Sequence, residues 1–149
     1  MQITSRERTS KFLSRLLKAE RVGDFIKENK NGMEAERKFS EYLKDICEAK
    51  GFTVREQVMS RAEISFSYGH QIFRGLHVPS RDKTIQLAFG LGLNLDETQA
   101  LLRHANHNPL YPKLKRDAVI IFCVNKRKTL LETQNMLFEN ELKTFDFGG

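Results

Sequence analysis

The stretch from residue 53 to residue 80, TVREQVMSRAEISFSYGHQIFRGLHVPS, constrains the fold more than any other part of the chain. Thr53 and Glu56 have the spacing of a capping box, which predicts a short helix that begins at Val54 and ends near Ala62. Apolar residues recur at helical spacing on one face of that helix. They are Val54, Val58, Met59 and Ala62.

A second short helix is expected to follow. Ser65 or Ser67 is placed to cap it, and Gly75 is placed to end it in the left-handed conformation. Its inward positions are Gly69, Ile72 and Phe73. Two short helices joined by a turn of about four residues have the geometry of a helix-turn-helix, which places its second helix in the major groove of DNA.

This pattern resembles the lambda-repressor-like (Cro/cI, XRE-type) helix-turn-helix domain of bacteria and phages over about Phe39 to Leu102. The chain departs from the family pattern at three positions. Glu63 stands where the family usually has a turn glycine, Gly69 where it has an inward Ile or Val, and Phe73 where it often has an acidic residue. The resemblance implies a DNA-binding transcriptional regulator. It is carried by Val58-Met59, Ile64-Ser65, Ile72, Arg74-Gly75, Pro79-Ser80 and the apolar helix that follows.

The resemblance also implies which side chains contact DNA. The recognition helix, about Ser65–Arg74, would lie in the major groove and read base edges. The base-reading candidates are Ser65, Phe66, Ser67, His70 and Gln71. Exposed Phe66 and Tyr68 could instead belong to the core or to a protein-binding patch.

Phosphate contacts are expected around the end of the recognition helix and the start of the next helix. The alternative for the basic residues here is a solvated turn that includes a pair with Asp82. The candidates are Tyr68, Arg74, His77, Ser80, Arg81 and Lys83.

The charge distribution is compatible with a polyanionic partner. The net charge is +6, and residues 110–128 carry six basic and one acidic side chain, whereas residues 129–149 carry one basic and four acidic ones. No window has the apolar length of a membrane span, and the N-terminus lacks the apolar core of a signal peptide, so we expect a cytoplasmic protein without membrane contact. Cys47 and Cys123 lie in apolar runs and are expected in the core.

The whole chain is predicted to be all-α. The expected parts are an N-terminal helical arm (residues 1–32), a five-helix lambda-repressor-like domain with the helix-turn-helix (residues 33–107) and a C-terminal helical hairpin packed on it (residues 108–149). The arm has a possible break at Gly23, and it could pack on the domain, touch the DNA backbone or form a dimer contact. Residues 144–149 are expected to fray.

Capping signals mark several of the remaining helices. Gly51 and Gly92 are placed to end helices, and Ser80 is placed to begin one. Further capping boxes are predicted from Asn94 with Glu97 and from Thr129 with Glu132.

An internal repeat relates two of these segments at an offset of 35 residues. RDKTIQLAFGLGLNLDETQALL from Arg81 aligns with RDAVIIFCVNKRKTLLETQNML from Arg116, and the two capping boxes coincide. Each copy is predicted to be a helical hairpin, with the second stacked on the first. The repeat could reflect duplication or a locally favourable solution used twice.

Enzymatic chemistry has no clear signal in the sequence. His104 and His107 lack the further ligands of a zinc site and are interpreted as surface or helix-end residues, so no metal or cofactor is expected. Asp146-Phe147-Gly148 matches a kinase triplet without the other kinase motifs. The expected partner is double-stranded DNA, with a possible homodimer. The alternative is a protein-interaction adaptor that holds a protein partner on the same scaffold.

Overall fold

The computed structural model describes residues 9–30 and 37–148, and these residues form helices and loops with no strand among them. The predicted all-α class is therefore confirmed. The chain divides into two compact units, residues 1–36 and residues 37–149. Within the described residues, no helix has the length and apolar character needed to cross a bilayer.

The N-terminal unit contains two short helices, α1 (Thr9–Lys18) and α2 (Val22–Glu28). The ring of Phe12 packs edge-on against that of Phe25, with 5.2 Å between the ring centroids. The break between the helices precedes α2, so Gly23 lies inside a helix and not at the predicted break.

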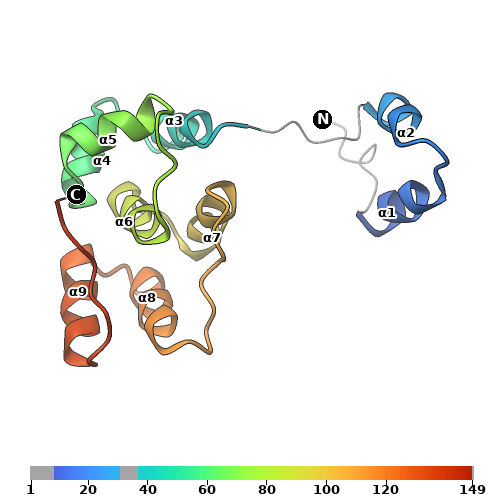
Figure 1. Cartoon of the computed structure of the whole chain (residues 1–149). Coiled ribbons are helices and arrows are strands. Elements are labelled where there is room, and N and C mark those ends of the chain that lie inside the picture. The colour runs from blue at the N-terminus through green and yellow to red at the C-terminus, as the bar shows by residue number, and fades with distance from the viewer. Residues whose placement is uncertain (1–8, 31–36, 149) are drawn as a thin grey trace. The chain divides into compact units, whose positions relative to one another are not determined.

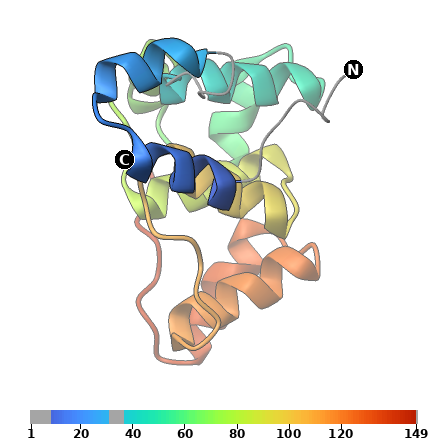
Figure 2. The same ribbon diagram turned by 90° about the vertical axis from the view of Figure 1, so that its right-hand side faces the viewer.

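The larger unit is built in three layers, which Figures 1 and 2 show from two directions. One layer holds α3, α4 and α5, the middle layer holds α6 and α7, and the last holds α8 and α9. The helices are α3 (Phe39–Ala49), α4 (Arg55–Arg61), α5 (Phe66–Phe73), α6 (Arg81–Leu91), α7 (Leu95–His104), α8 (Lys115–Asn125) and α9 (Leu130–Glu139).

The middle layer joins two hydrophobic cores, and α6 contributes to both. Leu87, Ala88 and Leu91 face the core shared with α3, α4 and α5, whereas Ile85 belongs to the core shared with α8 and α9. A helix buried on several sides has no polar face, which explains why α6 shows little amphipathic pattern.

Most of the predicted helix ends are confirmed. Ser65 and Ser80 accept hydrogen bonds from backbone amides at the starts of α5 and α6, and both distal capping boxes are complete. The three predicted terminal glycines have positive φ angles, as a left-handed helix end requires. These angles are 81° at Gly51, 79° at Gly75 and 68° at Gly92.

The capping box predicted at Thr53 is wrong. α4 begins at Arg55, and its N-cap is Val54, which has an extended backbone and offers no capping side chain. Thr53 therefore lies one residue too early to cap the helix. Val54 is 45% exposed and does not join the apolar face on which Val58, Met59 and Ala62 are buried.

The 35-residue repeat is present in the structure as two hairpins, α6–α7 and α8–α9. Gln99 exchanges two hydrogen bonds with the backbone of Leu110, at 2.9 and 2.7 Å, and Gln134 does the same with Phe145, at 2.8 and 2.7 Å. The second core is assembled from related positions, among them Ile85 with Ile120, Leu102 with Leu137, and Leu110 with Phe145.

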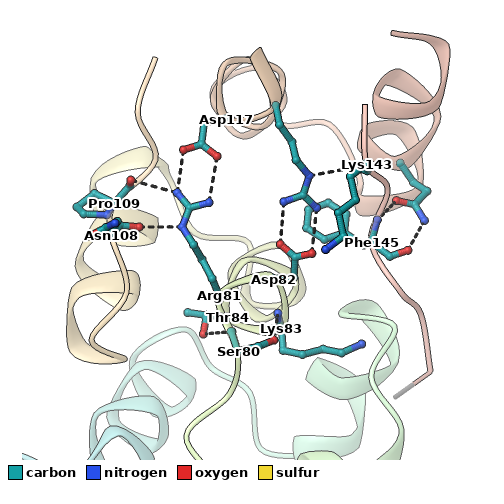
Figure 3. A network of polar contacts seen from close by, with 12 residues as sticks. Ser80, Arg81, Asp82, Lys83, Thr84, Asn108, Pro109, Asp117, Lys143 and Phe145 are labelled. Atoms are coloured by element: carbon teal, nitrogen blue, oxygen red, sulfur yellow. Dashed lines mark hydrogen bonds and ion pairs between the residues drawn. The ribbon is translucent and has the colours of Figure 1, made fainter. Parts of the chain in front are cut away.

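Two ion pairs join the hairpins, and in each an arginine of one hairpin binds an aspartate of the other (Figure 3). Arg81 of the first binds Asp117 of the second at 2.8 Å, and Arg116 of the second binds Asp82 of the first at 2.8 Å. Arg127 donates to the carbonyl of Gly92, which occupies the related position of the other hairpin. This reciprocity is the contact pattern of a two-fold interface, here formed within one chain.

The prediction that the C-terminal segment frays is wrong for residues 144–148, which are held against the rest of the larger unit. Phe145 is only 2% exposed, and the amide of Gly148 donates to the carbonyl of Glu63 at 2.8 Å. Lys83 donates to the carbonyl of Asp146. The segment is held because Phe145 completes the second core in the same way that Leu110 does in the first hairpin.

Candidate nucleic-acid interface

α4 and α5 are two short helices joined by a short connection. α4 ends at Arg61, and the chain turns through Glu63, whose φ of 56° lies in the left-handed region. The amide of Ile64 donates to the carbonyl of Met59 at 3.0 Å, which closes the turn. Ser65 then caps α5 by accepting from the amide of Tyr68 at 3.2 Å. These local hydrogen bonds fix the connection between the two helices.

Gly69 explains how closely α5 approaches α4. A Cβ atom at this position would lie 2.5 Å from the sulfur of Met59, which is itself fully buried. The absence of a side chain therefore permits the close crossing of the two helices. Glycine weakens α5 by about 0.5–1 kcal/mol relative to alanine, and the structure shows the packing that offsets this cost.

Buried side chains fix which face of α5 points outward. Gly69, Ile72 and Phe73 are buried against the first core, as predicted. Phe66 is 50% exposed and Ser67 is exposed, while Gln71 is half-buried and Ser65 serves as the cap. The outward face therefore carries an aromatic ring, a hydroxyl and an amide, which are groups suited to contacting base edges.

His70, also predicted to read bases, has a partner within the protein. Its Nε2 atom lies 2.9 Å from a carboxylate oxygen of Glu56 on α4. The two side chains are 45% and 41% exposed, so this contact lies at the surface. It joins the outward faces of the two motif helices.

Four of the predicted phosphate-binding residues lie at least partly at the surface, one within α5 and three in the segment that follows it. Arg74 is exposed at the C-cap of α5, and His77 is exposed in the following linker. The half-buried ring of Tyr68 stacks on that of His77, with centroids 6.3 Å apart. The hydroxyl of Ser80 caps α6 by accepting from the amide of Lys83.

The structure places Arg81 and Lys83 differently. The guanidinium of Arg81 donates twice to Asp117 and also to the carbonyls of Asn108 and Pro109 (Figure 3). The side chain of Lys83 is buried and donates to the C-terminal segment. Both cations are held by partners inside the chain, so neither is part of the interface proposed below.

Sequence reasoning missed the support beneath the turn between α4 and α5. Gln86 of α6 donates to the carbonyl of Ala62 at 2.9 Å, and the amide of Gly148 binds the carbonyl of the next residue, Glu63. The 35-residue repeat could have predicted this support. If the alignment is extended beyond the two hairpins, Phe145 becomes the equivalent of Leu110, so the C-terminal segment is expected to be anchored in the same way. The turn is therefore held from behind by α6 and by the end of the chain.

The two cysteines belong to the cores and not to a reactive site. Both are buried, as predicted, and both are free thiols. Burial raises the pKa of Cys47 to about 11, and burial also raises the pKa of Cys123. Both therefore remain protonated thiols at neutral pH, which makes them poor nucleophiles. Within the described residues, no group of three or more His, Cys, Asp or Glu side chains is arranged to hold a metal ion.

Comparison with known proteins adds no relative: no family model, curated protein or solved structure matches this chain. The class defined by the fold is an all-helical protein in which a short two-helix motif is supported by a pair of repeated hairpins.

Proposed function

We propose that the chain binds double-stranded DNA in a sequence-specific manner and regulates transcription, with α5 in the major groove. α3 to α7 would then form the five-helix domain of lambda-repressor type. The observation that carries the proposal is the outward face of α5, where Phe66, Ser67 and Gln71 have no role in the core. A short capped helix projecting such groups from a rigid turn is suited to reading base edges.

Gln71 and Arg74 would have different roles in this interface. The amide of Gln71 can bond bidentately to adenine, whereas the guanidinium of exposed Arg74 would neutralise a phosphate. Gln71→Ala should therefore weaken binding to the preferred site by about 1–3 kcal/mol and leave binding to random DNA nearly unchanged. Arg74→Ala should weaken both alike and lower the slope of log affinity against log salt by about one unit.

The experiment begins with selection of bound sequences from a random DNA pool, followed by salt titration of the wild type and both variants. Lys113→Ala removes an exposed cation from the loop before α8 and serves as the matched control. An affinity for DNA that does not depend on salt, or no binding at low salt, would reject the proposal. If Gln71→Ala weakens all sequences equally, the placement of α5 in the groove is wrong.

A homodimer is part of the proposal, because repressor-like domains read two half-sites about one DNA turn apart. Sedimentation equilibrium measures this directly. A monomer at tens of micromolar that binds a single half-site would exclude it.

The second candidate function is a protein-interaction adaptor. It is favoured by the apolar side chains exposed next to the motif, since Leu76 and Val78 of the linker after α5 are each 59% exposed and Phe66 is 50% exposed. Failure of DNA binding together with retained folding of the chain would make this candidate the leading one.

A further inference from the structure

The α8–α9 hairpin has a face that corresponds to a covered face of its relative, the α6–α7 hairpin. Leu87, Leu91 and Leu101 of α6–α7 are buried in the core shared with α3, α4 and α5. Within the larger unit, no described helix covers α8 and α9 on the side away from α6 and α7 (Figures 1 and 2). The residues 35 positions after the three leucines are Phe122, Lys126 and Met136.

Contacts of α7 show which residues of α9 belong to the same face. Glu97 of α7 binds Lys50 of α3 at 2.9 Å. His104 of α7 stacks on Tyr42 of α3, with 3.6 Å between the ring centroids. Their equivalents on α9 are both acidic and both exposed, namely Glu132 and Glu139.

We call this surface the outer face of the α8–α9 hairpin, and it combines an apolar part with charged residues. Phe122 is 47% exposed, and Met136 is half-buried. The two helices meet beside these side chains, because the sulfur of Cys123 lies 3.3 Å from that of Met136. The members of the outer face are Phe122, Lys126, Glu132, Met136 and Glu139.

The charges of the outer face are divided between its two helices. Lys126 is the C-cap residue of α8, and its ammonium group lies 5.9 Å from the centroid of the Phe122 ring. Neither Lys126 nor Glu139 forms an ion pair with another described residue. The division extends to the neighbouring sequence, since residues 110–128 carry six basic and one acidic side chain and residues 129–149 carry one basic and four acidic ones. The α8 side of the face is therefore positive and the α9 side negative.

We infer that the outer face of the α8–α9 hairpin binds the same face of a second copy of the chain, related to the first by a two-fold axis. α8 of each copy would lie on α9 of the other. A two-fold axis makes each contact occur twice, so a face with opposite charges on its two helices is complementary to itself. A nucleic acid would match only α8 and would be repelled by α9.

In this dimer, Lys126 of each copy approaches Glu139 of the other, and the two Phe122 rings lie in the apolar part of the interface. Aromatic and methionine side chains surrounded by charged residues are the usual composition of such interfaces. Reciprocal pairing already occurs within the chain, where each hairpin supplies one arginine and one aspartate to the other.

The inference rests on the homodimer included in the proposed function and identifies its interface. Self-association is measured without DNA. Failure of the inference and failure of DNA binding are therefore separate results.

The test is sedimentation equilibrium of the full chain and of two charge-reversal variants. Lys126→Glu and Glu139→Lys each bring like charges together at both copies of the contact, so each should weaken self-association at least tenfold. Both side chains are exposed, and circular dichroism should show the wild-type fold in both variants. Lys113→Glu is the control, because its equivalent in the first hairpin, Val78, is 59% exposed and lies outside the first core. It should dimerise as the wild type does.

Mixing the two variants supplies the decisive measurement. A dimer of one Lys126→Glu chain and one Glu139→Lys chain has opposite charges at both contacts, so the mixture should form a heterodimer about as tight as the wild-type dimer. Because both variants keep a net positive charge, a general attraction between them cannot produce this result. Phe122→Ala removes the exposed ring and should also weaken the wild-type dimer about tenfold.

Three results would overturn the inference. The first is a wild type that is monomeric at hundreds of micromolar, which would leave the outer face to a different protein. The second is equal dimerisation of the wild type and both charge-reversal variants, which would place the interface elsewhere. The third is a mixture of the two folded variants that remains monomeric.

Discussion

The two ion pairs between the hairpins offer a comparison in which the chemistry is constant and the burial differs. Asp117 and Arg81 have side chains that are 4% and 28% exposed, whereas those of Asp82 and Arg116 are 25% and 20% exposed. Asp117 accepts two hydrogen bonds from Arg81 and one from the amide of Tyr111. Neutralising Asp117 therefore removes more interactions from a drier site than neutralising Asp82.

The expected cost of Asp117→Asn is about 3 kcal/mol. Breaking a buried pair by removing one partner costs about 3–5 kcal/mol, and the partial exposure of Arg81 places this pair at the lower end. Asp82→Asn should cost about 1 kcal/mol, the upper limit for surface pairs, because both side chains of this pair are half-buried and water still reaches the carboxylate. These losses correspond to melting temperatures lower by roughly 10 °C and roughly 3 °C. Urea unfolding followed by circular dichroism measures both.

The dependence of the free energy of unfolding on pH supplies a second measurement. Burial acts to raise the pKa of Asp117, but the hydrogen bonds from Arg81 and Tyr111 and the charges of Arg81 and Arg116 outweigh it and lower the pKa. Because the folded-state pKa lies below the unfolded value of about 3.9, the contribution of this carboxylate is present above that value and is lost as pH falls further. The stability difference between wild type and Asp117→Asn should therefore shrink below about pH 4. Equal costs for the two variants, or a larger cost at Asp82, would refute this reasoning.

Three further substitutions test the supports of the motif. Gly90→Ala should destabilise the protein by about 1–3 kcal/mol, because its Cβ would lie 2.7 Å from the carbonyl oxygen of Val58, and the midpoint of urea unfolding measures the loss. Glu63→Gly should raise the melting temperature slightly, because a left-handed backbone costs a non-glycine residue about 1–2 kcal/mol; a lower melting temperature would contradict the strain argument. Phe145→Ala should cost about 3–5 kcal/mol, whereas a frayed segment would show no change on thermal unfolding.

The helix ends were predictable because they depend on residues close in sequence. Ser65, Ser80 and Gly75 act through bonds to residues a few positions away, so their roles follow from spacing alone. Thr53 shows the limit of this approach, since Thr53 and Glu56 have the spacing of a capping box but the chain begins α4 one residue later. Local patterns define the existence of a helix better than its first residue.

The partners of Arg81 and Lys83 could not be predicted in the same way. Asp117 lies 36 residues after Arg81, and Asp146 lies 63 residues after Lys83. Their sequence context, a basic turn at a helix start, is equally typical of a phosphate contact. The recurrence of Arg-Asp at the start of both hairpins was the available clue, because stacking two such hairpins brings each arginine to the other's aspartate.

Because the two hairpins belong to one polypeptide, equivalent positions can carry different residues and can differ in burial. In a dimer of identical hairpins, any substitution would alter both sides of the interface together. Here Leu87 is fully buried beneath α4 and α5, while its counterpart Phe122 is 47% exposed. The α6–α7 hairpin packs against α4 and α5, whereas the α8–α9 hairpin packs only on the other side of α6–α7. The two hairpins can differ in this way because each has its own sequence.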